Sequence, residues 1–113
     1  MRHCLTLDLK NIPDKIADYE IWHSPETIWP EIPQGLRTVG IREMEIYRWE
    51  NRLFMIVETD HDFDWEKQMA ILSTLPRQQE WERLMDAYQQ RLTRDSDTKW
   101  QPMKNIFNLT HCE

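Results

Sequence analysis

The segment from Tyr19 to Trp29 holds the residues whose types and spacing are best suited to chemistry. Tyr19 and His23 are four residues apart, so on a helix both side chains point in one direction. A phenol beside an imidazole is a usable acid/base pair near neutral pH, because histidine titrates there. Trp22 and Trp29 follow closely, and the flat apolar surface of tryptophan suits packing against a sugar ring. The same spacing also fits a structural pair, with the tyrosine packed on a sheet and the histidine capping a helix end.

Other candidate groups are more ordinary. Glu31, Glu43 and Glu45 could be carboxylate partners for a hydroxyl-rich ligand, although Glu43 and Glu45 also fit a solvated strand face. Trp65 and Trp81 stand at core positions of their expected helices. The remaining histidines are scattered and lack the spacing of metal ligands, so we expect no metal and no cofactor: His3, His61 and His111.

Motifs and composition exclude several classes of protein. The chain has no GxSxG, P-loop or GxGxxG motif, which argues against hydrolase, nucleotide and dinucleotide chemistry. Its net charge of −6 argues against a nucleic-acid partner, because such affinity rests largely on cationic neutralisation of phosphates. No apolar run approaches the roughly 20 residues that cross a bilayer, and no signal peptide begins the chain. We therefore expect a cytoplasmic protein without a membrane partner.

Length and cysteine content fit one small intracellular domain. A chain of 113 residues has the modal size of a single domain, so residues 1–113 are expected to fold as one unit. Cys4 and Cys112 lie near opposite ends and are expected to be free thiols. If the terminal strands paired, the two thiols could approach each other, and the sequence leaves this open.

Periodicity predicts the elements that must position Tyr19 and His23. Alternating or continuous apolar residues predict strands over residues 3–9, 41–49, 53–57 and 103–110. A helix is expected to begin at Pro13 and carry Tyr19 and His23, and another to run over residues 27–39, interrupted at Pro30 and Pro33 and ended by Gly40. Glu50 and Asn51 form a predicted turn, with Asn51 tolerating the left-handed conformation.

Two further helices are expected in the second half of the chain. Asp62 is predicted to cap the first, which carries Trp65, Met69 and Leu72. Ser73 or Thr74, followed by Pro76, is predicted to begin the second, and residues 93–99 read as a loop. The apolar stripe of this last helix is the best helical pattern in the chain: Trp81, Leu84, Met85, Tyr88 and Leu92.

The order strand, helices, strand, strand, helices, strand predicts an α+β fold. Two halves of this kind joined by a hairpin describe a ferredoxin-like plait, with a four-stranded antiparallel sheet covered by helices on one face. The other face needs a cover, and in a small chain with six tryptophans a second copy of the chain suits that role. We therefore expect a homodimer of the dimeric α/β barrel type.

Several short motifs follow one another along the chain. They are Tyr19 with His23, the sequence from Ile28 to Ile32 and the strand from Met44 to Tyr47. They continue with the strand from Leu53 to Glu58, Gln79 with Trp81, and the late run Ile106, Phe107 and Leu109. With these residues the chain resembles the L-rhamnose mutarotase family from about residue 3 to residue 110.

The resemblance implies a dimeric ferredoxin-like enzyme, an aldose 1-epimerase that interconverts the α and β anomers of a 6-deoxy-L-hexose. It implies that His23 is the catalytic proton donor and that Tyr19 and Trp81 contact the sugar, with Met44 where a family tyrosine does so. Such a reaction needs an acid and a base but no metal or cofactor.

Three departures from the family pattern concern the sugar-contacting residues. The spacing from His23 to Trp29 is two residues longer, Met44 replaces a tyrosine, and Glu82 replaces the second tryptophan of a pair. The reaction is therefore expected to be kept, with either L-rhamnose or L-fucose as the sugar. The alternative is another use of the same fold, as a dimeric small-molecule monooxygenase or a non-catalytic ligand-binding module.

Overall fold

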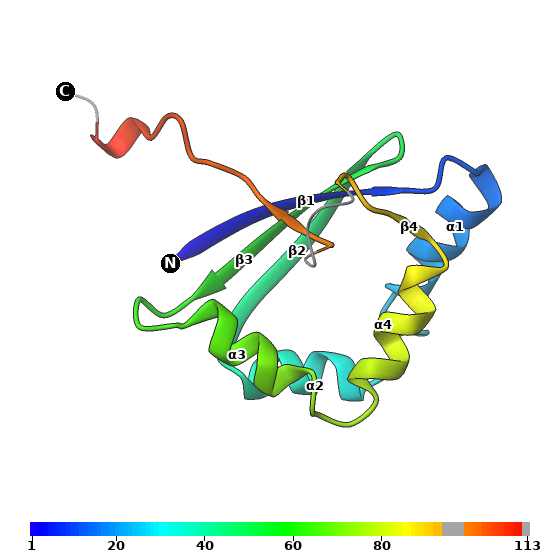
Figure 1. Cartoon of the computed structure of the whole chain (residues 1–113), viewed down its shortest axis with the longest axis horizontal. Coiled ribbons are helices and arrows are strands. Elements are labelled where there is room, and N and C mark those ends of the chain that lie inside the picture. The colour runs from blue at the N-terminus through cyan, green and yellow to red at the C-terminus, as the bar shows by residue number, and fades with distance from the viewer. Residues whose placement is uncertain (94–98, 112–113) are drawn as a thin grey trace.

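The computed structural model describes residues 1–93 and 99–111 and has an antiparallel sheet at its centre (Figure 1). Three long strands make most of it, and two short ones lie at its edge. Their bounds are β1 Arg2–Leu9, β2 Ile41–Trp49, β3 Arg52–Thr59, β4 Gln89–Gln90 and β5 Gln101–Pro102. The strand order is β2-β3-β1-β4, and β5 pairs with β1 beside β4. This is the order of the predicted ferredoxin-like plait.

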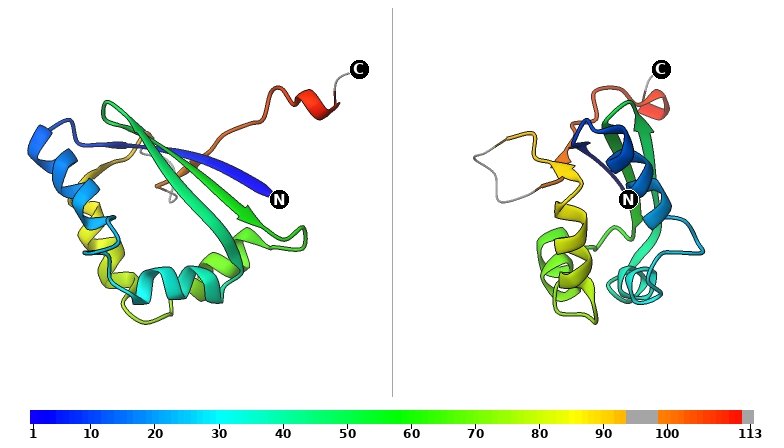
Figure 2. Two further views of the ribbon diagram at one scale, coloured as in Figure 1. Left: turned by 180° about the vertical axis from the view of Figure 1, so that it is seen from behind. Right: turned by 90° about the vertical axis from the view of Figure 1, so that its right-hand side faces the viewer.

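The four α-helices found in the described residues lie on one side of the sheet, as Figure 1 and Figure 2 show from three directions. Their bounds are α1 Pro13–Trp22, α2 Glu31–Thr38, α3 Trp65–Leu72 and α4 Gln78–Asp86. None of the helices in the described ranges is long and apolar enough to span a membrane.

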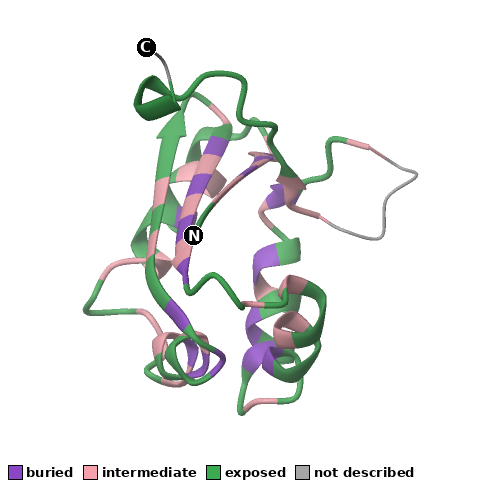
Figure 3. Cartoon of the chain, turned by 90° about the vertical axis from the view of Figure 1, so that its left-hand side faces the viewer, coloured by how far each residue is buried: buried purple, intermediate pink, exposed green. Residues whose placement is uncertain are grey.

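Alternation along the strands divides the sheet into two faces. Leu5 lies opposite Met55 and Leu7 opposite Leu53, and all four side chains are buried toward the helices. Buried and intermediate residues therefore alternate along β1 and β3 (Figure 3). We call the helix-covered side the inner face and the opposite side the outer face.

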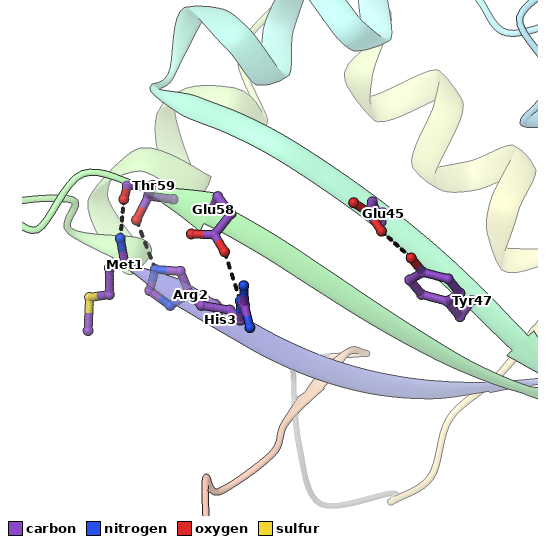
Figure 4. A network of polar contacts seen from close by, with 7 residues as sticks. All are labelled: Met1, Arg2, His3, Glu45, Tyr47, Glu58 and Thr59. Atoms are coloured by element: carbon purple, nitrogen blue, oxygen red, sulfur yellow. Dashed lines mark hydrogen bonds and ion pairs between the residues drawn. The ribbon is translucent and has the colours of Figure 1, made fainter. Parts of the chain in front are cut away.

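The outer face carries polar and aromatic side chains. Arg2 forms an ion pair with Glu58 across β1 and β3, with 2.7 Å between Nε and Oε1 (Figure 4). Tyr47 donates a hydrogen bond to Glu45 on β2. Beyond β5, the C-terminal segment runs along the side of the sheet away from the helices and ends in a 3₁₀ turn, η1 Leu109–His111 (Figure 2).

Helix α2 begins later than predicted because the prolines stand at its start. Pro30 is its N-cap and Pro33 lies in its first turn, where the backbone N–H has no partner within the helix. Proline costs little there, so the predicted interruption at Pro33 is wrong. Gly40, with φ of +101°, ends the helix as predicted and leads into β2.

Other predicted boundaries also need correction. Asp64, not Asp62, caps α3, since its side chain accepts a hydrogen bond from the Lys67 N–H. Helix α4 begins after Arg77, which has φ of +64°, rather than at Ser73 or Thr74. The predicted turn between β2 and β3 is present, but its left-handed residue is Glu50 and not Asn51.

The predicted fourth strand over residues 103–110 is wrong. Those residues are exposed, and the sheet edge is built instead by the two-residue strands β4 and β5. Leu92 likewise lies beyond α4, which ends at Asp86. Cys4 is a free cysteine of intermediate burial, whereas Cys112 lies outside the described residues.

Candidate active site

A pocket of about 270 Å³ lies between the inner face of the sheet and the helices. This volume is just below the roughly 300–1,000 Å³ of pockets for drug-sized ligands, so it suits a smaller molecule. Most of the wall is apolar, and Met69 and Trp100 contribute to it. The polar side chains are few, and they are Tyr19, His23, Gln78, Glu82, Gln89 and Lys99.

The four residues predicted to form the site all line this pocket. Tyr19 comes from α1 and His23 from the C-cap of that helix, Met44 from β2 and Trp81 from α4. Met44 points inward because it lies opposite the buried Val57 in the register of β2 with β3. The fold thus brings together residues from both halves of the chain, while their roles in binding and catalysis stay predictions.

The His23 ring has one nitrogen committed to its own helix. Its Nδ1 lies 2.7 Å from the Tyr19 carbonyl oxygen, and because a carbonyl only accepts, Nδ1 carries the proton. The opposite nitrogen, Nε2, then holds the lone pair of the neutral ring. Burial lowers the pKa of His23, and the hydrogen bond to the Tyr19 carbonyl raises it by less. His23 is therefore a neutral base at pH 7.

Tyr19 places a protonated phenol, which can donate a hydrogen bond, beside the neutral His23 ring. Its ring lies beside that of His23, with 4.3 Å between ring centroids. Burial raises the pKa of Tyr19 to about 12, so the phenol keeps its proton throughout the physiological range. The Gln89 Nε2 donates to the Tyr19 hydroxyl at 3.4 Å, which leaves the phenolic hydrogen free to be donated elsewhere.

Trp22 and Trp29 pack against Trp81, which in turn packs against the His23 ring. The ring centroid of Trp81 is 5.4 Å from that of His23, and the two ring planes meet at 71°. Trp29 packs edge-on against Trp81 at 5.4 Å, and Trp22 does so at 6.5 Å. The Arg77 guanidinium lies over Trp29, 3.7 Å from its centroid. This cluster of four tightly packed aromatic rings limits how far the imidazole can turn.

The residues between His23 and Trp29 form a closed turn. The backbone N–H groups of Thr27 and Ile28 donate to the Ser24 carbonyl at 3.1 and 3.0 Å. The turn directs Ile28 into the pocket wall. The segment between His23 and Trp29 therefore contributes an apolar side chain to the pocket wall.

Glu82 belongs to a polar group at the pocket wall rather than to an aromatic pair. Its Oε1 accepts from Gln78 Nε2 at 2.9 Å, and its Oε2 lies 2.8 Å from Lys99 Nζ. Lys99 also pairs with Asp86 at 2.9 Å, and its side chain is only 15% exposed. Glu82 is thus a hydrogen-bonded carboxylate at the pocket wall.

The other carboxylates considered as ligand partners do not line this pocket, although Glu43 lines a neighbouring cavity together with His23 and Met44. Glu43 and Glu45 are exposed on the outer face, which agrees with the solvated reading of that strand. Glu31 pairs with Arg77 at 3.6 Å. Across residues 1–93 and 99–111, histidine, cysteine and carboxylate side chains form no group of three that could hold a metal ion.

Sequence reasoning missed Gln89, Lys99, Gln78 and Trp65 as pocket residues. Trp65 was interpreted as core, and it packs against the core while also lining the pocket. Gln89 carries no detectable signal, because the apolar stripe predicted that the helix continues through its position. Lys99 was placed in a polar loop with no indication of which way it points.

Comparison with known proteins now adds a family. The model of the L-rhamnose mutarotase family matches residues 2–109. An L-fucose mutarotase of Xanthomonas campestris is 38% identical over 110 residues, which are 96% of this chain and 88% of that protein. An L-rhamnose mutarotase of Shigella flexneri is 33% identical over 76 residues, covering 66% of this chain and 68% of that protein.

Two solved structures share the fold. L-rhamnose mutarotase from Formosa agariphila superposes with a TM-score of 0.66 at 21% identity, covering 96% of this chain and 97% of its own. Tetracenomycin F2 cyclase from Streptomyces glaucescens, a type-II polyketide cyclase, does so with 0.58 at 16%, with the same coverage. The predicted ferredoxin-like α+β fold is confirmed. Because the second protein has a different activity, the fold by itself does not decide function.

Proposed function

The chain belongs to the L-rhamnose mutarotase family of carbohydrate epimerases, and from this premise we propose that it interconverts the anomers of a 6-deoxy-L-hexose by acid/base catalysis at His23. The observation that carries the proposal is the imidazole itself. Its Nδ1 is tied to the Tyr19 carbonyl, so the lone pair of Nε2 is available on the other side of the ring. A phenol and an indole adjoin that ring in the same pocket.

Mutarotation needs only proton transfers. A base takes the proton of the anomeric hydroxyl, the bond from C1 to the ring oxygen breaks, and the ring oxygen gains a proton. The aldehyde then turns about the C1–C2 bond, and the reverse steps close the ring on the other face. His23 serves as the base and, once protonated, as the proton donor. Tyr19, as a neutral phenol, orients the ring oxygen by donating a hydrogen bond.

The pocket wall suits a sugar that lacks one hydroxyl. Met44, Ile28 and their apolar neighbours can accommodate the C6 methyl group, and Trp81 can pack on the apolar face of the ring. L-Fucose and L-rhamnose share that methyl group and differ in configuration at C2 and C4. We favour L-fucose, because the similar L-fucose mutarotase matches 96% of the chain and the L-rhamnose mutarotase 66%.

Exchange NMR tests the proposal directly. Saturation of one anomeric proton should be transferred to the other anomer faster with the protein than in buffer, first for L-fucose and then for L-rhamnose. L-Galactose, which differs from L-fucose only in its C6 hydroxyl, is the matched control and should be accelerated less than L-fucose. If neither deoxysugar exchanges faster than in buffer, the protein is not a mutarotase of 6-deoxy-L-hexoses.

The comparisons do not favour the alternative uses of this fold, a small-molecule monooxygenase or a ligand-binding module. Ligand-induced stabilisation separates them from a sugar enzyme. We expect L-fucose or L-rhamnose to raise the melting temperature. Stabilisation by aromatic compounds but by neither deoxysugar would favour the alternatives.

We also propose that the protein acts in the cytoplasm as a homodimer formed through the outer face. None of the described α-helices lies on this side, and Trp49 is 68% exposed there. The C-terminal segment on the same side presents Ile106 and Phe107, which are 90% and 68% exposed. An apolar segment with so little contact to its own chain suits a second copy.

Light scattering coupled to size exclusion tests the dimer. The Phe107→Asp variant should elute as a monomer at concentrations where the unmodified protein is a dimer, because a carboxylate would be buried without a partner. Ile21→Asp is the matched control, since Ile21 is 57% exposed on α1, on the helix side. Equal dissociation by both variants, or by neither, would rule out this interface.

A further inference from the structure

Gln89 is a polar residue that the proposed reaction does not use. It begins β4, where it lies opposite Leu9 of β1. Residues directly opposite on paired strands share a face, and Leu9 is buried on the inner face. The Gln89 side chain therefore points inward, lines the pocket and is 8% exposed. Gln90, the next residue, lies opposite Asp8 and is exposed.

The two ends of the Gln89 amide differ in their contacts. Its Nε2 donates to the hydroxyl of Tyr19 at 3.4 Å. Its Oε1 is fully buried and finds no hydrogen-bond partner in the described part of the chain. Buried acceptors are seldom left without a donor, because water is no longer there to satisfy them. The free oxygen thus marks a place where a donor from a ligand fits.

From this geometry we propose that Gln89 binds the substrate, its Oε1 accepting a hydrogen bond from one sugar hydroxyl. The inference rests on the proposed function and deepens it by adding a residue to the sugar site. Gln89 and Tyr19 act as a matched pair. The amide N–H occupies a lone pair of the phenol, the phenol donates its own hydrogen to the sugar, and the amide oxygen accepts one.

A donor and an acceptor held side by side select for hydroxyl groups. A hydroxyl can donate and accept, so adjacent sugar hydroxyls satisfy both groups, whereas a methyl group satisfies neither. A site built to hydrogen-bond a hydroxyl rejects analogues that lack it, because its buried polar groups are then left unpaired. Gln89 therefore favours a hydroxylated ring over an apolar ligand of the same size.

The test is a thermodynamic cycle that combines a Gln89 variant with sugars that each lack one hydroxyl group. Gln89→Leu should raise the dissociation constant of the parent sugar, measured by tryptophan fluorescence, by about threefold to tenfold. One monodeoxy analogue, missing the hydroxyl that Gln89 contacts, should bind the variant and the unmodified protein about equally. Gln90→Leu, the same change on the neighbouring exposed residue, should leave every constant unchanged.

Each outcome bears on the proposal. A dissociation constant in Gln89→Leu that equals that of the unmodified protein overturns it, as does an equal loss for every deoxy analogue, which would indicate a general packing defect. Gln89→Met, which keeps the unbranched shape, repeats the cycle should the leucine variant not fold. Absence of accelerated anomer exchange in the unmodified protein is a different result, because it removes the proposed reaction and not the binding role of Gln89.

Discussion

The inner and outer faces of one sheet carry different kinds of side chain, although the same strands supply both. Inward residues such as Leu7 and Leu53 are buried under the helices. The same inner face borders the pocket that holds the neutral His23 ring and the protonated Tyr19 phenol. Outward residues such as Glu45 and Tyr47 contact each other and solvent (Figure 4). The difference teaches that alternation by one residue can give one sheet a pocket-lining face and a solvent-facing one.

Replacing His23 should have the largest effect on the inner face. His23→Ala removes the proposed proton-transfer group, so we expect anomer exchange to fall by about 10²- to 10⁴-fold. His61→Ala is the control, because His61 is exposed in the connection from β3 to α3. Exchange NMR measures both rates, and circular dichroism checks that each variant is folded. Normal exchange by folded His23→Ala would remove the imidazole from the mechanism.

Two tryptophans test whether the faces serve different purposes. Trp81 is 6% exposed at the centre of the aromatic cluster, so Trp81→Ala should lower the free energy of unfolding by about 3–5 kcal/mol. This loss should not depend on protein concentration. Trp49→Ala on the outer face should instead weaken the proposed dimer, so its effect on stability should fade as the protein is diluted. Urea denaturation at several protein concentrations would show both, and a concentration-dependent loss in Trp81→Ala would contradict the division.

Acid should reduce activity through the inner face. Burial lowers the pKa of His23 below the ordinary value of about 6.5, so the ring stays neutral further into acid. We expect kcat/KM to fall with a midpoint below pH 6.5. The neutral ring contributes stability that is present above pH 6.5 and is lost as the pH falls through the lowered pKa. Unfolding of His23→Ala should therefore depend less on pH in that range, and a midpoint above 6.5 would show that the imidazole is not buried.

The same division explains which parts of the fold could be predicted. The strands over residues 3–9 and 53–57 were predicted because their residues alternate or run apolar against a buried face. The apolar run around Ile106 and Phe107 has the same pattern but lies exposed. An apolar pattern indicates that side chains are suited to burial. It does not indicate whether their own chain or a second molecule buries them. The two-residue strands β4 and β5 are too short to have a pattern.

The site was predictable to a similar extent. Tyr19 and His23 meet because four residues return a helix to the same face, which spacing alone reveals. Trp81 was assigned to the site by the family resemblance, because its helical stripe alone indicated a core position. Gln89 and Lys99 could not be predicted, because their positions depend on where α4 ends and how the chain returns to the sheet edge. Contacts between segments that are far apart in the sequence cannot be seen in local periodicity.

The smallest expected effect is on stability, when one ion pair from each face is removed. On the inner side, Lys99 lies between Glu82 and Asp86 with its side chain 15% exposed. On the outer face, the pair of Arg2 with Glu58 has side chains that are 68% and 37% exposed. An exposed pair is screened by water and salt, while a half-buried one is screened less.

Lys99→Met and Arg2→Met each remove the cation and keep most of the apolar stem. We expect Lys99→Met to lower the midpoint of urea denaturation and Arg2→Met to leave it nearly unchanged, at equal protein concentration. Because Lys99 separates two carboxylates, its loss leaves Glu82 and Asp86 to repel each other, and added salt should recover part of the difference. Equal shifts of the urea midpoint in the two variants would show that the half-buried ion pair contributes no more to stability than the exposed one. The stability of the inner face would then come from packing and hydrogen bonds alone.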